Sequence, residues 1–251
     1  MMLAKRLSLL ALFMLCFATM TSAPSTASDL TEALKARDVA QVRSLLAAGA
    51  NVNEKVRGDY PLNIAAVFGP AEMVSVLLEA GSDIEKPGRD GLHPLHNAVI
   101  SGRTEIVALL LQRGAEVDAK DRQGRTPLLS FAAIAGSNID IPRRLLAAGA
   151  DPAAEETIDQ LRALDFAAIS GEFELVKLLL STGVDVNHRQ GGFWGETALM
   201  HAVFHDRRET VRLLIAHGAD VNLANKQGQK PMYFAKGKPE MQQLLIKAGA
   251  K

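Results

Sequence analysis

Two histidines have the residue type and spacing of a metal site. His201 and His205 are four residues apart, which places two ligands on one face of a helix. The zinc-protease pattern also needs Glu directly after the first histidine, and Ala202 stands there. No third ligand is evident in the sequence, although Asp206 and His188 could approach. We therefore expect no bound metal and assign the two histidines a surface role.

The rest of the sequence contains no catalytic constellation. It has no Gly-x-Ser-x-Gly elbow, no Walker loop and no Gly-x-Gly-x-x-Gly. The single cysteine, Cys16, lies near the N-terminus, so the remainder has no thiol nucleophile and no cysteine-based zinc site. The 28 basic and 28 acidic residues cancel, which argues against nucleic acid or an anionic membrane as a partner. We predict a protein that is not an enzyme and binds no cofactor.

Residues 1–27 have the three-part pattern of a secretory signal peptide. Lys5-Arg6 is followed by an uncharged, mainly apolar run over residues 7–20 and then by small polar residues. We predict cleavage after Ala27 and export, to a bacterial periplasm first and to the extracellular space second. The alternative is an uncleaved membrane anchor, although the run is shorter than the roughly 18 apolar residues that a span needs.

A short phrase recurs through the rest of the chain. Two Leu-like residues and two variable residues are followed by Gly-Ala-Asp-Val-Asn or a near variant, with spacings of 31 to 35 residues between the glycines. These glycines are Gly49, Gly81, Gly114, Gly149, Gly183, Gly218 and Gly249. A second phrase, such as Thr126-Pro127-Leu128, follows about 14 residues after each internal glycine.

Each recurrence has the pattern of two helices. A proline begins the first helix, where its missing N–H costs nothing, at Pro61, Pro94, Pro127 and Pro231. Apolar residues at i, i+3 and i+4 give the second helix one buried face, as in Ile106, Leu109 and Leu110. The recurring glycine then forms a left-handed C-cap, and the polar stretch that follows has turn chemistry.

This pattern resembles the ankyrin repeat family, whose period is about 33 residues and whose phrase is Thr-Pro-Leu-His-x-Ala. The resemblance covers residues 29–251. It implies an all-α solenoid of about seven helix-turn-helix units, joined by β-hairpin-like fingers and stacked into one cooperative domain. The predicted domain spans residues 28–251, with repeats at about 29–53, 54–86, 87–119, 120–154, 155–187, 188–223 and 224–251.

Several repeats depart from the pattern. In the first, Asp29 and Glu32 suggest a capping box. In the last, Gly237 and Pro239 shorten the first helix. Two residues are inserted in the fourth repeat, Gln160 replaces a glycine in the finger of the fifth, and the finger of the sixth is enlarged over residues 189–195. Drift in tolerant loops and shaping for a partner both explain the fourth and fifth repeats.

The resemblance also implies where a ligand binds, namely on the concave side formed by the finger tips and the exposed ends of the first helices. Bulky apolar, aromatic and arginine side chains at these positions have the composition of a protein-binding surface. The predicted binding residues are Phe68, Arg89, Leu92, Ile100, Arg122, Arg125, Ile134, Leu161, Ile169, Phe193, Trp194, Phe204 and His205. The alternative for the helix positions is that they only pack between neighbouring repeats.

The sequence therefore predicts a monomeric, non-enzymatic protein–protein interaction module that acts outside the cytoplasm. An inhibitor or immunity protein and a helper of an exported enzyme are two versions of this function. One alternative is a secreted effector that binds host proteins. Another is a metal-dependent sensor or enzyme.

Overall fold

The computed structural model describes residues 26–55, 58–136 and 138–251. Over these residues the regular structure is helical, and Asp59 is a single bridge residue rather than a strand. No helix in the described segments is long and apolar enough to cross a bilayer. The chain divides into two compact units, an N-terminal unit up to Asp83 and a C-terminal unit from Ile84 onward, each described here by itself.

The predicted signal peptide lies almost entirely outside the described residues and stays a prediction. Helix α2 (Thr26–Lys35) includes Ala27, so the predicted cleavage bond falls in its first turn. The predicted capping box at Asp29 is wrong, because the helix starts three residues earlier and Asp29 lies inside its first turn. There its carboxylate still interacts favourably with the positive end of the helix dipole.

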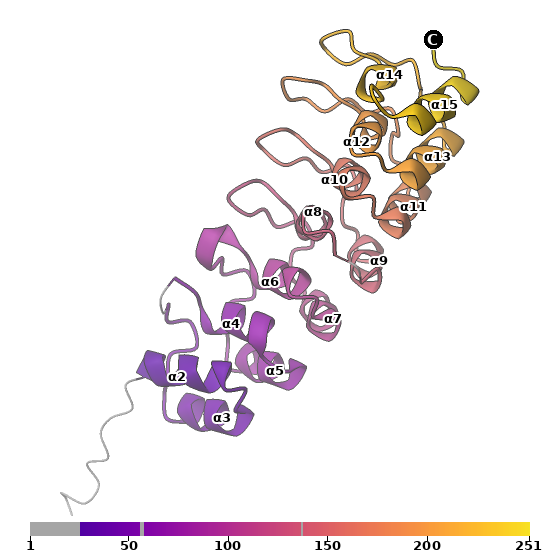
Figure 1. Cartoon of the computed structure of the whole chain (residues 1–251). Helices are drawn as coiled ribbons and strands as arrows, with labels where there is room; N and C mark the ends of the chain where they lie inside the picture. The colour runs from indigo at the N-terminus through magenta and orange to yellow at the C-terminus, as the bar shows by residue number, and fades with distance from the viewer. Residues whose placement is uncertain (1–25, 56–57, 137) are drawn as a thin grey trace, which may run out of the picture. The chain divides into compact units, whose positions relative to one another are not determined.

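The described residues of the N-terminal unit form four helices (Figure 1). After α2 come α3 (Val39–Ala47), α4 (Pro61–Phe68) and α5 (Ala71–Glu79). Helix α2 packs against α3 and α4, while α5 packs against α3 and α4. Asp38 caps α3 by accepting a hydrogen bond from the Gln41 amide at 2.9 Å.

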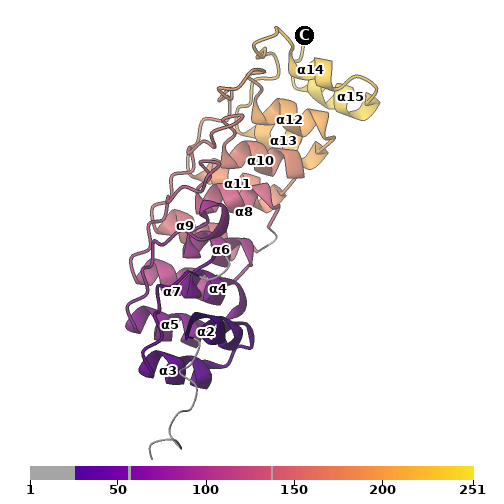
Figure 2. The same cartoon turned by 90° about the vertical axis from the view of Figure 1, so that its left-hand side faces the viewer.

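The C-terminal unit repeats the same helix pair five times. Its helices are α6 (Pro94–Ile100), α7 (Thr104–Gln112), α8 (Pro127–Ala133), α9 (Asp140–Ala147), α10 (Ala163–Ser170), α11 (Phe173–Ser181), α12 (Ala198–Phe204), α13 (Arg208–Ala216), α14 (Pro231–Phe234) and α15 (Pro239–Lys247). The first helices, α6, α8, α10, α12 and α14, contact one another in sequence and form an inner layer. The second helices lie on the side of this layer that faces away from the segments between repeats, as Figures 1 and 2 show.

The local signals of the sequence determine where the helices begin and end. Proline is the first residue of α4, α6, α8 and α14, as predicted. The seven recurring glycines have φ between 81° and 94°, the left-handed region that favours glycine. At Gly149, for example, the following Ala150 amide donates back to the carbonyl of Leu145. The core between the layers is aliphatic, with Leu95, Leu110 and Leu128 buried.

The segments between one repeat and the next form the predicted fingers. Those of the C-terminal unit are each closed by a backbone hydrogen bond across the base, such as Asn225 N to Gln229 O at 2.9 Å. Neighbouring fingers are joined by backbone hydrogen bonds as well, such as Lys226 N to Trp194 O at 2.9 Å. Gln160 has φ of 56° and replaces the left-handed glycine of the other fingers, as predicted.

Candidate functional site

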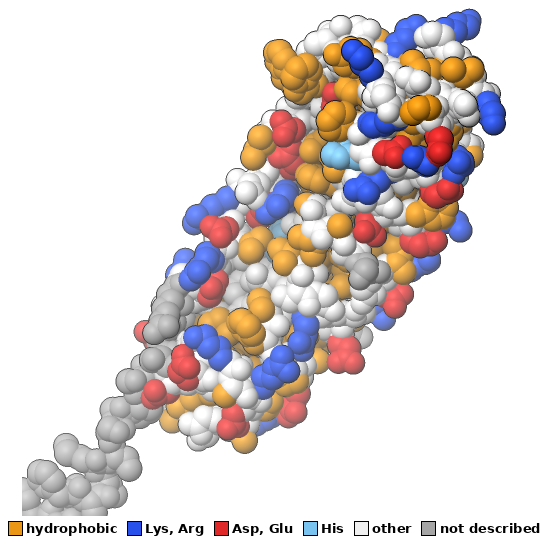
Figure 3. Space-filling view, viewed as in Figure 1, with side chains coloured by type: hydrophobic (Ala, Val, Ile, Leu, Met, Phe, Trp, Pro, Cys, Tyr) orange, Lys and Arg blue, Asp and Glu red, His pale blue; other side chains and the backbone are white. Residues whose placement is uncertain are grey.

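Large hydrophobic side chains are exposed on the side of the C-terminal unit that carries the fingers. We call the exposed side chains of the fingers and of the C-terminal ends of the first helices the finger-side face. In repeats six and seven, Phe193 is 76% exposed, Trp194 49%, Phe204 58% and Tyr233 60%. Figure 3 shows hydrophobic and basic side chains gathered at this end of the unit.

Four aromatic rings meet where α12 and α14 end, and we call them the helix-end cluster. The ring of Phe204 lies edge-on to His205 at 5.0 Å and to Phe234 at 6.4 Å between centroids. Phe234 in turn meets Tyr233 at 5.4 Å. These edge-to-face contacts fix the rings before any partner arrives.

Lys238 fixes this cluster in place. Its Nζ donates to the carbonyl oxygens of Val203 at 3.0 Å, Phe204 at 2.6 Å and Phe234 at 3.1 Å. The same ammonium lies 5.4 Å from the centre of the Phe204 ring, within cation–π range. One lysine therefore caps the C-terminal ends of α12 and α14 together.

Phe193 and Trp194 form a second aromatic group, the finger pair, in the finger of repeat six. Their rings are 5.0 Å apart and edge-to-face. From the next finger, Lys226 Nζ donates to Gly191 O at 2.6 Å and to Gly192 O at 2.7 Å. The finger of repeat five lies against the same backbone, since a β-carbon at residue 191 would meet the end of the Gln160 side chain. The finger pair is thus exposed on a backbone held by both neighbouring fingers.

The predicted aliphatic positions are less uniform. Ile134 is exposed, whereas Ile100 and Ile169 are half-buried in the inner layer. Among the finger positions, Leu92 and Leu161 are also half-buried. Packing therefore explains part of the apolar character at these half-buried positions, and their contact with a partner stays a prediction. Phe68, in the N-terminal unit, is 45% exposed at the end of α4.

The predicted arginines differ in the same way. Arg89 and Arg122 are exposed, and the ion pair of Arg122 with Asp90 is long, at 3.9 Å. Arg125 is half-buried and pairs with Asp121 at 2.9 Å. Asp121 also accepts the amides of Gln123 and Arg125, so this ion pair builds the finger itself.

The structure corrects the surface role predicted for His201, which is buried. Its Nδ1 lies 3.6 Å from Glu196 Oε2, and its Nε2 has no hydrogen-bond partner. Burial, with a smaller contribution from His205, lowers the pKa of His201 to about 4. His205 is exposed, and His188 lies 3.2 Å from Glu155 instead. Nowhere in the described segments do three His, Cys, Asp or Glu side chains gather as a metal would require.

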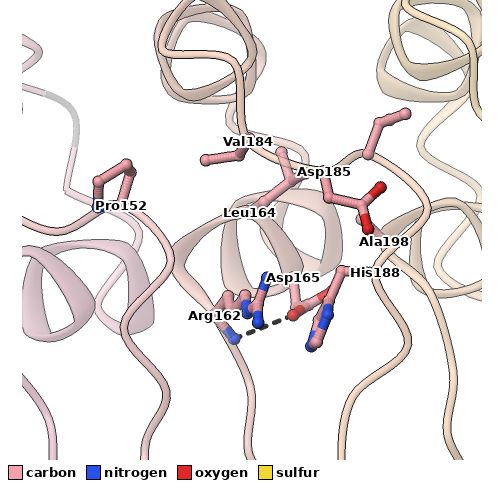
Figure 4. A pocket seen from close by; sticks show the side chains of 9 residues that line it. Pro152, Arg162, Leu164, Asp165, Val184, Asp185, His188 and Ala198 are labelled. Atoms are coloured by element: carbon pink, nitrogen blue, oxygen red, sulfur yellow. Dashed lines mark hydrogen bonds between the residues drawn. The ribbon is translucent and has the colours of Figure 1, made fainter.

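A small cavity lies beside α10 (Figure 4). Its volume of about 10 Å³ suits one water molecule and is too small for a substrate. Asp165 accepts the Arg162 amide at 2.9 Å, and Arg162 donates to Glu155 at 2.7 Å. Burial raises the pKa of Asp165 to about 7. This group caps a helix and ties a finger to it, which is a structural role.

Sequence reasoning missed two exposed residues of this face. Ile158 projects from the finger of repeat five and is 70% exposed. Tyr233 occupies a position whose counterparts in the earlier repeats are buried, namely Asn63, His96, Leu129, Asp165 and Met200. No local pattern in the sequence marks Tyr233 as exposed, because its exposure depends on what packs against the four-residue helix α14.

Comparison with known proteins agrees with the fold. The family model for ankyrin repeats matches residues 30–121, 117–190 and 164–251. The crystal structure of the human ASB11 ankyrin repeat domain superposes with a TM-score of 0.77 at 25% identity, covering 88% of this chain and 98% of that one.

Curated relatives show the same repeats in proteins of different size. The ankyrin repeat protein YahD of Escherichia coli (strain K12) is 26% identical over 231 residues, which cover 89% of this chain and 96% of YahD. Fowlpox virus ankyrin repeat protein FPV031 is 39% identical over 108 residues, which cover 43% of this chain and only 31% of the viral protein. Ankyrin repeats are in general non-enzymatic modules that bind other proteins. With the family model matching from residue 30 to residue 251, this chain belongs to the ankyrin repeat family.

Proposed function

We propose that this protein is a non-enzymatic binding module whose finger-side face holds a partner protein. The observation that carries the proposal is the exposure of Phe193, Trp194, Phe204 and Tyr233 in two adjacent repeats. Aromatic side chains of this kind supply most of the binding energy of protein interfaces. Monomeric proteins seldom leave several such rings exposed together without a binding role.

The way the rings are held supports the same function. Lys238 fixes the helix-end cluster and Lys226 fixes the backbone of the finger pair. Binding therefore loses little side-chain or loop entropy, since the face is already ordered. A preformed face favours rigid docking over coupled folding.

We place this module outside the cytoplasm, in a periplasm or secreted from the cell. The support is the signal-peptide pattern of residues 1–27 together with a remainder that has no cysteine to oxidise. In the periplasm it would inhibit or assist an exported enzyme, and outside the cell it would act as an effector on host proteins. Detection of the native protein in the periplasmic fraction or in the culture medium separates these destinations.

The experiment is affinity capture from the native extracellular or periplasmic fraction with the wild type and with Trp194→Ala/Phe204→Ala. Phe173→Ala/Ile246→Ala is the matched control, because it also removes two exposed apolar side chains but from the outer helices α11 and α15. The proposal expects a protein captured by the wild type and the control and lost with the first variant. Equal capture by all three would overturn the proposed face.

A further inference from the structure

Basic residues are concentrated in the repeat that carries Tyr233 and Phe234, two of the four rings of the helix-end cluster. Residues 224–251 contain six lysines and one acidic residue, Glu240. Residues 28–223 contain 20 basic and 27 acidic residues, so the rest of the predicted domain is net acidic. The zero net charge of the whole chain therefore conceals a positive end.

Four cations of repeats six and seven are held against backbone carbonyls. Arg207 Nε donates to Ile169 O at 2.9 Å, and Arg189 Nη1 donates to Ala224 O at 3.2 Å. Lys226 and Lys238 bind the finger and helix-end carbonyls described above. None of the four takes part in the ion pairs of the described residues. Carbonyl dipoles fix the positions of these charges without neutralising them.

The outer layer of the same repeats is different. On α13, Arg208 pairs with Asp206 and Glu240, and Arg212 pairs with Glu209. Each of these guanidinium groups has a carboxylate beside it. The four cations held by carbonyls lie instead beside the fingers and first-helix ends that also expose Phe204 and Trp194.

We infer that the partner docks through an acidic protein segment that carries large apolar side chains. Its apolar side chains pack on the finger pair and the helix-end cluster, and its carboxylates meet the fixed cations and the exposed lysines Lys230 and Lys236 beside them. Charge-assisted hydrogen bonds of this kind need no reorganisation of the face, since the cations are already in place. This inference rests on the proposed function and adds to it the chemistry of the partner.

An anionic membrane would also suit aromatic and basic residues, but the arrangement favours a protein. Membrane-surface binding uses one long amphipathic helix with a continuous apolar face. Here the rings come from a finger, from the end of α12 and from the four-residue helix α14. Such a discontinuous surface is suited to a shaped partner.

The test uses short random peptides displayed on phage, selected on the immobilised full chain. We expect enriched peptides to be acidic and to contain aromatic or leucine residues. A synthetic peptide of the enriched sequence should bind about tenfold more weakly to Lys230→Glu/Lys236→Glu, two exposed lysines that flank Tyr233. The matched control Lys177→Glu/Lys247→Glu carries the same charge change on the outer helices and should bind as the wild type does.

The outcomes separate this inference from the proposed function. Neutral or basic peptides that need Phe204 and Trp194 would overturn the acidic partner and leave the binding face intact. Peptides indifferent to Phe204→Ala/Trp194→Ala would overturn the face itself. Failure to enrich any peptide, or binding only to phosphatidylglycerol vesicles and not to phosphatidylcholine vesicles, would also overturn the inference.

Discussion

Lys238 places its ammonium 2.6 Å from the carbonyl oxygen of Phe204 and 5.4 Å from the centre of the ring of the same residue. A single side chain from repeat seven thus holds both the backbone and the ring of an exposed residue of repeat six. The two repeats present the helix-end cluster as one surface because this contact joins them.

Replacing Lys238 should loosen that surface and destabilise the fold. Lys238→Met keeps the aliphatic stem but removes three hydrogen bonds to helix-end carbonyls and the cation–π contact. We expect the free energy of unfolding in urea to fall by about 1–2 kcal/mol. Lys236→Met, at an exposed lysine two residues earlier, is the control and should change it by less than about 0.5 kcal/mol. Equal effects of the two would contradict the capping role.

The contact between Lys226 and the finger of repeat six can be followed by fluorescence, because Trp194 is the only tryptophan in the chain. Lys226→Met removes the two hydrogen bonds to Gly191 O and Gly192 O. We expect acrylamide to quench Trp194 more efficiently in this variant, since the finger samples more open conformations. Lys230→Met provides the comparison, and unchanged quenching in both proteins would show that the finger is held by other contacts.

The buried carboxyl of Asp165 should make stability depend on pH. Burial raises its pKa to about 7, so between pH of about 4 and 7 the folded state holds a proton that the unfolded state has released. The stability that the protonated Asp165 carboxyl gives the folded state is therefore lost as the pH rises through 7. Asp165→Asn keeps an acceptor for the Arg162 amide and should stabilise the protein relative to the wild type by about 1–3 kcal/mol at pH 8 and much less at pH 4.

The comparison must be made between variant and wild type at each pH. Burial lowers the pKa of His96 and of His201 to about 4. The two histidines therefore change stability with pH in the direction opposite to that of Asp165. These histidines are neutral in the folded state, so their effect is a loss of stability as pH falls below about 6.5. A stability difference between Asp165→Asn and the wild type that does not change with pH would contradict the account of Asp165.

The side chain four residues after a recurring glycine forms hydrogen bonds to the corresponding turn of the next repeat, and we call this series of bonds the ladder. One repeat lacks a side chain that can form them. Asn187 donates to Gly218 O at 3.0 Å and accepts from the Asp220 amide at 2.7 Å. Ala153 occupies the same place in its repeat, four residues after the recurring glycine, and has no polar side chain to bind the next turn. We predict that Ala153→Asn adds these two bonds to the turn at Gly183 and raises the free energy of unfolding by about 1 kcal/mol.

The reverse substitution supplies the control for this prediction. Asn187→Ala should lower the free energy of unfolding by about 1–2 kcal/mol, because both hydrogen bonds of the Asn187 side chain, to Gly218 O and from the Asp220 amide, are lost. Both values come from urea titrations under the same conditions. If Ala153→Asn is neutral while Asn187→Ala destabilises, the turn at residue 183 does not have the geometry that the ladder requires.

Much of the fold could be predicted because its signals are local. Proline at the start of the first helix and glycine after the second act on the backbone within a few residues. The register alone showed that Gln160 replaces the glycine of the other fingers, and its φ of 56° gives it the same left-handed backbone. The same register identified Phe193, Trp194 and Phe204 as positions outside the core, and all three are exposed.

The features that could not be predicted depend on neighbouring repeats. His201 is buried on α12, which packs against α10 and α14 of the neighbouring repeats, and no local pattern gives this packing. The carbonyls of Ile169, Val203 and Phe204, which bind Arg207 or Lys238, lie 34 to 38 residues earlier in the chain. A helix start can also move, as at Asp29, when preceding residues continue the helix.

The central claim is that the aromatic residues of repeats six and seven anchor a partner protein. The most direct measurement is the equilibrium dissociation constant of the captured partner with Phe204→Ala and with Phe173→Ala. The account predicts that Phe204→Ala weakens binding by at least about 2 kcal/mol, or some thirtyfold, and that Phe173→Ala leaves it unchanged. Equal affinities of the two variants, or a larger loss with Phe173→Ala, would contradict it.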